Sequence, residues 1–486
     1  MSGVPSNIIL PIVGIDFDGS QAQSIDSDKM PVNVLVIGQR LATGTVAAKT
    51  KYLATSAEEV AIKSGRGSML HKQAQKLFKN NNTVPVTFVG LDDATSSTAG
   101  KAVVTFSGTA TSSGTLSCYL YGTKYAVSVA SGDAAAAVAT ALVTAINADV
   151  NAYASASASS ATVTVTAGNK GIAAGDIDLR FNDSDGEQFP SGISAGAVTV
   201  TAGTVDPDIA DALSTIGDSW YNVIVNPYTD DTNLTKLEEL LQTNDSATIM
   251  HTSLAIQATR KTRNDQITYN TNSNRNSQYI ANFPAYKRCE ATWEIASAIA
   301  GAVAASVQDD PAKPLHRLTL KGLRAQNIND RWTFTERNLV AINGGGTLTD
   351  DLGVALEATV TMYLKNSAGA PDTAYQYMNT MFTLSAVRYL FVNAINKKYA
   401  RAKLSKSRDG IGPGELIMTE ATAKAEAISW FLAMRTKAYF EGGADVLKQF
   451  KDELVVKITG NRVEWLLPPD LINQFIVGSG TIRFKL

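Results

Sequence analysis

Hydrophobic and polar positions repeat with two different periods along most of this chain. Near-continuous apolar runs at 32–37 and 220–226 are typical of strands that are buried on both faces of a sheet. Apolar residues spaced by three or four positions follow at 68–78 and 231–241, and this spacing predicts helices with one buried face. Strands that alternate with helices predict an α/β core built on a largely parallel sheet.

The same patterns predict further elements in the two flanks of a distinct middle segment. Ser56 and Glu59 have the spacing of a capping box that opens a helix. Asp206 and Pro207 are suited to the N-cap and first turn of another helix that ends near residue 216. Further strands are expected at 84–89, 247–250, 355–363, 454–458 and 462–467, and further helices at 284–306, at 371–404 and from Thr419 to about 442.

The middle segment, 91–205, has a composition of its own. Ala, Ser, Thr and Gly make up 67 of its 115 residues, and its net charge is −5, against +3 for 1–90 and zero for 206–486. Its period is mostly two, except after Asp133, a candidate N-cap followed by apolar residues at helical spacing. We therefore expect an inserted β-rich α+β domain with strands at 103–106, 115–121, 125–130 and 162–166.

Both ends of the chain resemble strands that have no partner nearby in the sequence. The N-terminal segment, 7–17, carries the apolar residues Ile8, Ile9, Ile12, Ile15 and Phe17. At the C-terminus Ile482, Phe484 and Leu486 alternate with Arg483 and Lys485, and the candidate hinges Gly478 and Gly480 precede them. Such strands either join the sheet of their own chain as edge strands or add to the sheet of a neighbouring subunit.

One segment is strongly basic. Residues 388–408 contain no acidic residue, and their cations form a candidate interface ridge, which consists of Arg388, Lys397, Lys398, Arg401, Lys403, Lys406 and Arg408. The ridge is either a solvated helix face or a surface that meets acidic groups of a neighbouring subunit. A nucleic-acid surface is disfavoured because no exposed aromatic residues are interleaved with the cations.

Composition and chemistry exclude several classes of protein. The chain of 486 residues is 44% hydrophobic and 18% charged with a net charge of −2, so we expect a folded protein without a nucleic-acid or membrane partner. The apolar stretch at 293–307 is too short for a membrane span, and no secretory signal is visible at the N-terminus.

The residues that usually carry catalysis are scarce. The three histidines and two cysteines, which are His71, His251, His316, Cys118 and Cys289, have no metal-ligand spacing, and no nucleophile elbow or phosphate-binding loop occurs. We expect no enzyme activity, no catalytic residue, no metal and no cofactor.

Four stretches resemble the tail sheath proteins of contractile-tailed bacteriophages, and the Mu-like type above all. They are SWYNVIVNP at 219–227, KKYARAKL at 397–404, LLPPDLINQF at 466–475 and the inserted domain. The resemblance implies a subtilisin-like α/β core, where the name describes a fold and not hydrolysis, together with extended terminal β-arms. It also implies a structural subunit of the virion tail that is assembled in the host cytoplasm.

The same resemblance implies how the subunit works. Sheath subunits polymerise as stacked six-fold rings around an inner tail tube, with baseplate and tail terminator proteins at the ends. They contract from a metastable extended state and drive the tube through the host envelope for genome delivery, while exchanged terminal arms hold the subunits together. Alternatives are the sheath of a phage-derived bacteriocin or injection system and, in another class, a secreted adhesin or a hydrolase on a doubly wound core.

These observations divide the chain into five parts. We expect an N-terminal arm and linker at 1–29, a first part of the core at 30–90, the outward-facing inserted domain at 91–205, a second part of the core at 206–474 and a C-terminal arm strand at 475–486.

Overall fold

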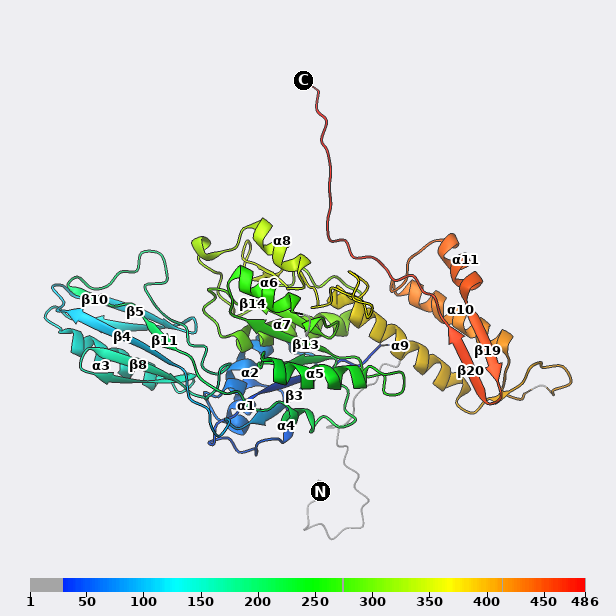
Figure 1. Cartoon of the computed structure of the whole chain (residues 1–486), viewed down its shortest axis with the longest axis horizontal. Coiled ribbons are helices and arrows are strands. Elements are labelled where there is room, and N and C mark those ends of the chain that lie inside the picture. The colour runs from blue at the N-terminus through cyan, green and yellow to red at the C-terminus, as the bar shows by residue number, and fades with distance from the viewer. Residues whose placement is uncertain (1–28, 273–274, 413, 486) are drawn as a thin grey trace, which may run out of the picture.

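The computed structural model describes residues 29–272, 275–412 and 414–485. Figure 1 shows three groups of elements in a row along the longest axis: the β-rich segment at the left, a helix-covered sheet in the middle, and helices with a hairpin at the right. Each group has its own cluster of buried apolar side chains. The expected N-terminal strand with Ile8, Ile9, Ile12, Ile15 and Phe17 lies outside the described residues, as does Leu486.

The central sheet has six strands in the order β14-β13-β12-β1-β3-β2, and only β2 is antiparallel to its neighbour. The expected parallel α/β core is therefore present. Its first four parallel strands are almost wholly buried, as near-continuous apolar runs require. The six strands are β1 (Val34–Gln39), β2 (Lys51–Ala54), β3 (Val86–Leu91), β12 (Val223–Val225), β13 (Leu254–Thr259) and β14 (Ile280–Pro284).

Helices cover both faces of this sheet. The connections from β1 to β3 and from β12 to β13 run across the sheet in opposite directions, so right-handed crossovers place α2 and α5 on opposite faces. Ser56, Ser68 and Asp230 cap the helices that follow them by accepting a hydrogen bond from a first-turn N–H. The helices are α1 (Ala57–Ser64), α2 (Met69–Asn80), α4 (Ala210–Leu213), α5 (Asp231–Asn244), α6 (Arg263–Thr271), α7 (Thr292–Asp309) and α8 (Phe334–Ile342).

The β-rich segment between β3 and α4 consists of two sheets and one helix. One sheet has the path β10-β4-β8-β7, with β11 also paired to β4, and the other has the order β6-β5-β9. Helix α3 (Ala135–Ala148) buries Val138, Leu142 and Ile146 against them. The strands are β4 (Lys101–Gly108), β5 (Gly114–Leu120), β6 (Thr123–Val129), β7 (Ala154–Ser159), β8 (Thr162–Ala167), β9 (Leu179–Phe181), β10 (Ile193–Ala195) and β11 (Thr199–Thr201).

The last group begins with the long helix α9 (Met378–Tyr399), which runs out of the core (Figure 1). Its apolar cluster joins α9 to α10 (Glu420–Thr436), α11 (Ala444–Glu453) and the hairpin of β19 (Val455–Thr459) and β20 (Arg462–Leu466). Three short pieces complete the fold: β15 (Leu348–Thr349) pairs with β16 (Ala355–Leu356), β17 (Lys403–Leu404) pairs with β18 (Ile417–Met418), and a 3-10 turn covers Ile328–Asp330.

Several expected elements are wrong in position. The expected strand at 247–250 is a turn, and the strand of that region is β13. The helix expected at 284–306 begins only at Thr292, because Pro284 is the last residue of the edge strand β14 and 285–291 is irregular. The helix expected at 371–404 is limited to α9, and most of 355–363 is irregular.

Two expected N-caps are wrong as well. Asp133 accepts a hydrogen bond from the Ala130 N–H at 2.8 Å, and α3 begins after Ala134 without a side-chain cap. Asp206 accepts from the Ala173 N–H at 2.9 Å, and α4 begins four residues after Asp206. In both cases a tertiary or turn contact takes the carboxylate that local sequence assigns to the helix.

Candidate assembly interface

The C-terminal arm is hydrogen-bonded to the body of the protein up to Gln474, and its side chains are exposed from Phe475 on. Ile472 N–H donates to the Tyr439 carbonyl oxygen at 3.0 Å, and Asn473 donates to Glu441 Oε1 at 3.0 Å. Gln474 Nε2 then donates to the Ala312 carbonyl oxygen at 2.6 Å, and Ile476 and Val477 line a groove beside α8. The arm base, 470–477, therefore joins the C-terminal helices to the core.

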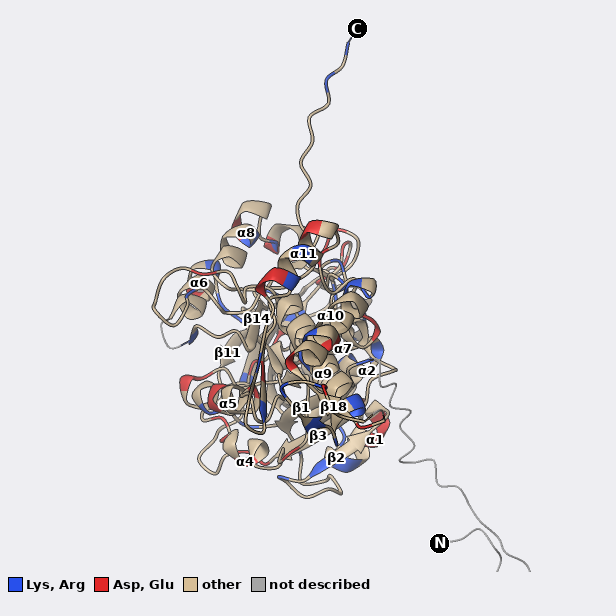
Figure 2. Cartoon of the chain, turned by 90° about the vertical axis from the view of Figure 1, so that its right-hand side faces the viewer, with Lys and Arg blue, Asp and Glu red and all other residues tan. Residues whose placement is uncertain are grey.

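The free segment begins at Gly478, which is one of the two candidate hinges. Figures 1 and 2 both show it projecting away from the body of the protein. Ile482 is 91% exposed and Phe484 is 79% exposed, and the segment forms no strand within this chain. Such an apolar strand has a high tendency to add to the sheet of another copy.

The hairpin β19–β20 offers an edge for strand addition. Ile458 N–H points outward and donates to Glu420 Oε1 at 2.9 Å, so its opposite residue, Val463, also points its backbone groups outward. By the same alternation Trp465 faces outward on β20. Among the described residues, no hydrogen bond joins the backbone of Val463 or Trp465 to a further strand. The β20 edge is therefore open, whereas Glu420 covers part of the β19 edge.

The outer edge of β7, by contrast, is closed. The Asn147 side chain lies across it: Nδ2 donates to the Ala156 carbonyl oxygen at 2.8 Å, and Oδ1 accepts from the Ala156 N–H at 2.9 Å. These two bonds reproduce those that a neighbouring strand would make at that residue. One amide side chain thus occupies the middle of an edge that otherwise consists of Ala and Ser.

The basic ridge is partly neutralised by acids from other parts of the chain. Arg388 Nη2 contacts Asp245 Oδ1 at 2.6 Å and ties α9 to the end of α5. Lys398 contacts Glu426 at 2.7 Å and Lys403 contacts Glu415 at 2.6 Å, and Lys403 lowers the pKa of Glu415. The remaining members of the ridge are Lys397 and the exposed residues Arg401, Lys406 and Arg408, the last of which donates to the Glu415 carbonyl oxygen.

The charges of the two ends of the molecule differ in sign. Residues 397–466 contain 13 Lys and Arg against 9 Asp and Glu, a net charge of +4, whereas 91–205 carry −5. Figure 1 places these two segments at opposite ends of the longest axis. The subunit is therefore an electric dipole along its length, and its two ends favour partners of opposite charge.

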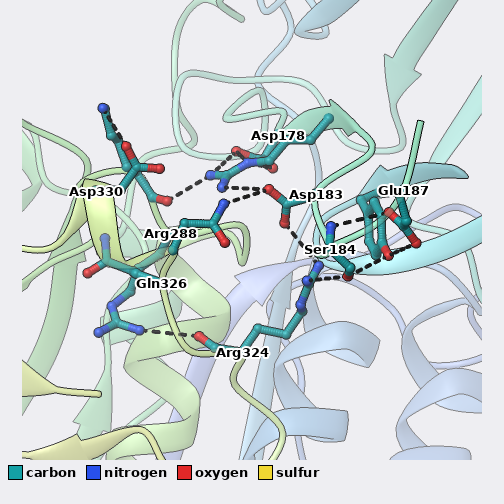
Figure 3. Close-up of polar contacts among 12 residues, drawn as sticks. Asp178, Asp183, Ser184, Glu187, Arg288, Arg324, Gln326 and Asp330 are labelled. Carbon is teal, nitrogen blue, oxygen red and sulfur yellow. Dashed lines mark hydrogen bonds and ion pairs between the residues drawn. The ribbon is translucent and has the colours of Figure 1, made fainter. Parts of the chain in front are cut away.

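Polar contacts and a pair of aromatic rings fix the β-rich segment to the core. Figure 3 shows Arg324 reaching Asp183 and Ser184, and the Arg324–Asp183 distance is 3.1 Å. Arg260 binds both carboxylate oxygens of Asp176 at 2.7 and 3.0 Å. Other contacts across this joint are Arg180 to the Lys287 carbonyl oxygen, Trp293 to the Ala173 carbonyl oxygen, and the ring pair Tyr153–Trp293.

The chain itself fills part of the crevice that holds ligands in many doubly wound folds. It lies at the carboxyl ends of β1 and β12, where the strand order reverses. There Gln39 Nε2 donates to the Lys170 carbonyl oxygen at 2.6 Å, and Asn169 Nδ2 donates to the Arg40 carbonyl oxygen at 2.8 Å. The base of the β-rich segment thus occupies the place of a ligand.

The candidate nucleophiles lie inside the protein. Burial raises the pKa of the Cys118 and Cys289 thiols to about 12, and burial lowers the pKa of His71 to about 4. The described residues contain no cluster of three or more His, Cys, Asp or Glu with the geometry of a metal site. Within the same residues no helix combines the length and the apolar character needed to cross a membrane.

The sequence pattern missed three features of this interface: the anchored arm base, the Asn147 closure and the Arg388–Asp245 pair. Only the arm base had a weak indication in the sequence: Pro468 and Pro469 disfavour a strand between β20 and the arm. The other two depend on residues that meet only in the folded chain, so no periodicity marks them.

Comparisons with known proteins identify the family of this chain. Residues 202–362 match the family model of the phage tail sheath protein central domain. The Mu-like prophage FluMu tail sheath protein of Haemophilus influenzae is 33% identical over 490 residues, which cover 100% of this chain and 99% of that protein.

Solved structures with a similar fold have lower sequence identity to this chain than the Haemophilus protein has. The sheath tail protein of Desulfitobacterium hafniense is 13% identical with a TM-score of 0.47, over 95% of this chain and 100% of that one. The sheath of an extracellular contractile injection system in its contracted state is 10% identical with a TM-score of 0.49, over 99% and 98%.

Identity over the full length with the Haemophilus protein shows the family: this chain belongs to the phage tail sheath proteins of the Mu-like type. It is a structural protein of a contractile phage tail, and its place is in the virion. A structural role agrees with the thin catalytic inventory of the sequence.

Proposed function

We propose that this protein polymerises through exchanged terminal arms into stacked six-fold rings around an inner tail tube and contracts to drive that tube through the host envelope. The observation that carries the proposal is the combination, in one subunit, of a projecting apolar strand and an open sheet edge. The strand has Ile482 and Phe484 on one side, and the edge belongs to β20. Each copy can therefore donate a strand and receive one.

The arm length limits where the receiving subunit lies. Nine residues follow Val477, and a fully extended segment of that length spans at most about 30 Å. Gly478 and Gly480 act as hinges, so the direction of the arm changes while its main-chain hydrogen bonds persist. The subunits of a sheath must slide over one another and stay attached. A strand exchanged through a flexible hinge allows the movement and keeps the attachment.

The other assignments concern the remaining parts of the subunit. The N-terminal arm and linker (1–29) supply a second exchanged strand through Ile8, Ile9, Ile12, Ile15 and Phe17. The core, 30–90 with 206–474, is subtilisin-like in fold, and the domain at 91–205 faces outward from the tube. The exposed ridge residues Arg401, Lys406 and Arg408 meet acidic groups on a neighbouring subunit or on the tube.

Contraction requires two states separated by a kinetic barrier. The extended state must lie above the contracted one by a few kcal/mol per subunit, as is usual for coupled transitions, and this difference adds over many subunits. Assembly takes place in the host cytoplasm with baseplate and tail terminator proteins. The same geometry also suits the sheath of a bacteriocin or an injection device, which differ in genomic context and not in chemistry.

Electron microscopy of two matched double variants tests the proposal. Ile482→Ser with Phe484→Ser removes the apolar face of the arm, whereas Arg483→Ser with Lys485→Ser removes only the charged face. We expect tubes or stacked rings from the unchanged chain and from the second variant, and no polymer from the first. Polymer that forms equally well from the first variant would show that the arm does not hold the sheath together.

A further inference from the structure

A groove lies beside the arm base at the point where the free segment begins. It has a volume of about 350 Å³ and is lined by Phe334 and Ile342 of α8, by Val360 and Tyr377 of the core, and by Ile476 and Val477 of the arm. Phe334 is 72% exposed and Ile342 is 56% exposed, and only Val340 of α8 is buried. The groove therefore has an uncovered apolar part beside α8, and its lining also includes the charged residues Arg317, Arg337 and Glu357.

The sequence of the arm has the pattern of a β-hairpin. The segments 474–477 and 481–484 are separated by Gly-Ser-Gly, and three-residue loops that contain Gly are common in hairpins. A Cβ atom at Gly478 would lie 3.1 Å from the Phe475 ring, so the start of the loop favours glycine. With this loop Ile482 lies opposite Ile476, and Phe484 lies opposite Gln474.

This register places the apolar side of the arm tip toward the groove. Ile476 already lines the groove, and the Gln474 side chain is turned to the core, where it binds the Ala312 carbonyl oxygen. Residues opposite each other in an antiparallel pair project to the same face. Ile482 and Phe484 would therefore project with them, while Arg483 and Lys485 would stay in water.

We propose that in the unassembled subunit the free segment folds back on the arm base as a β-hairpin and lays Ile482 and Phe484 in the groove beside α8. The contact shields the arm tip until a neighbouring β20 edge receives it. The tether keeps the effective concentration of the tip high, in the millimolar range for short flexible linkers. An isolated two-stranded hairpin is only marginally stable, so the closed form opens without a large barrier when a better partner is present.

That the hairpin shields the arm before assembly rests on the proposed function. That the hairpin forms does not, so hairpin formation and assembly are tested separately. Val463→Pro removes the outward N–H of β20 and is expected to keep the subunit unassembled with its arm intact. In this background Ile476→Cys is combined either with Ile482→Cys or, as the matched control, with Arg483→Cys. The native thiols do not compete, because burial raises the pKa of Cys118 and Cys289 to about 12.

We expect the 476–482 pair to form an intrachain disulfide about tenfold faster than the 476–483 pair at low protein concentration. Phe334→Ser is expected to slow the reaction of the first pair, whereas Leu339→Ser, an exposed residue of α8 outside the groove, is expected to leave it unchanged.

Equal rates for the two cysteine pairs would overturn the hairpin, because a flexible segment brings both pairs together alike. Disulfides that form only between chains would overturn the fold-back contact in favour of a second copy in the groove. If Phe334→Ser leaves the rate of the 476–482 disulfide unchanged, the arm tip does not bind in the groove beside α8. A different result would contradict the proposed function: Val463→Pro would still form polymer.

Discussion

The outer edges of β7 and β20 differ in how the chain treats their backbone groups. On β7 the Asn147 amide binds both groups of Ala156 and blocks strand addition. On β20 the outward groups of Val463 and Trp465 make no backbone hydrogen bond to another strand among the described residues. Most proteins protect every edge, because an exposed one recruits other chains. A subunit that polymerises by strand addition needs one open edge and must close the rest.

The edges of β7 and β20 also differ in where they lie in the molecule. The two edges lie in the end groups that Figure 1 separates most widely, and these groups carry net charges of opposite sign. Addition at β7 would join subunits at the wrong end and in no fixed register, because a strand of Ala and Ser specifies its register weakly. Closing β7 therefore contributes to the specificity of assembly as much as opening β20 does.

The largest effect is expected from closing the open edge. Val463→Pro removes an outward donor from β20 but no hydrogen bond of the β19–β20 ladder, because Val463 belongs to an outward-facing pair. We expect the polymer to be lost and the monomer to keep its helical content, measured by electron microscopy and circular dichroism. Val463→Ala keeps the N–H and should assemble normally; loss of polymer in both variants would mean that the side chain and not the edge is required.

Opening the closed edge is the second test. Asn147→Ala frees both backbone groups of Ala156, at a local cost of about 1–2 kcal/mol, and exposes a row of hydrogen-bonding groups. We expect side-by-side association of particles, seen as bundles in micrographs and as a rise in light scattering. Thr144→Ala on the exposed side of the same helix is the control. Unchanged scattering from Asn147→Ala would show that the edge is harmless without its cover.

The joint that holds β7 and its neighbours to the core gives a smaller, pH-dependent effect. Burial, followed by the nearby Asp230 charge, raises the pKa of Asp206 to about 6 from its ordinary 3.8. The folded state then disfavours the carboxylate, so this group destabilises the fold above pH 6 and contributes nothing below about pH 4. Asp206→Asn keeps the acceptor for Ala173 and should stabilise the protein by about 1 kcal/mol at pH 8.

Thermal unfolding between pH 4 and pH 8 measures this effect. The gain from Asp206→Asn should disappear as the pH falls to 4, and a gain that is the same at every pH would contradict the titration as its cause. Asp208→Asn is the matched control of opposite sign. The pKa of Asp208 is lowered, first by its bond to Lys236, so its loss should destabilise the protein slightly at pH 8 and not at low pH.

The smallest effect is expected from the basic ridge. Arg401 is exposed and forms no ion pair within the described part of the chain, whereas Lys403 already contacts Glu415. Arg401→Glu should weaken assembly by less than about 1 kcal/mol per contact, and more at 50 mM than at 500 mM salt. Sedimentation at both salt concentrations measures it. Assembly that is unchanged at either salt would remove Arg401 from the interface.

Some of this interface could be predicted from local pattern alone. The alternation at 481–486 identifies a strand without a partner nearby in the sequence, and the glycines at 478 and 480 precede it as candidate hinges. The helix caps Ser56 and Thr419 were also correct, because a cap and the N–H it binds are only three residues apart. Where the cap had a competing tertiary partner, as at Asp206, the prediction was wrong.

The ridge illustrates the opposite case. Its seven cations are conspicuous in the sequence because no acid lies among them, yet Asp245 lies 143 residues before Arg388 and binds it in the fold. A run of like charges is a property of one segment, whereas its electrostatic potential depends on every acid that packs nearby. The sequence therefore overstated the free charge of this surface.

The sequence by itself determined the parallel core, the separate β-rich segment and the apolar alternation at the C-terminus, because periodicity, composition and caps act between neighbours in the chain. Only the tertiary structure decided which edges are open and where the arm leaves the body. Asn147 closes β7 because α3 packs beside that edge, and the outward groups of Val463 stay open because no described segment forms a backbone hydrogen bond with them. Hydrogen bonds between distant segments require close packing of both, and no local pattern encodes that distance.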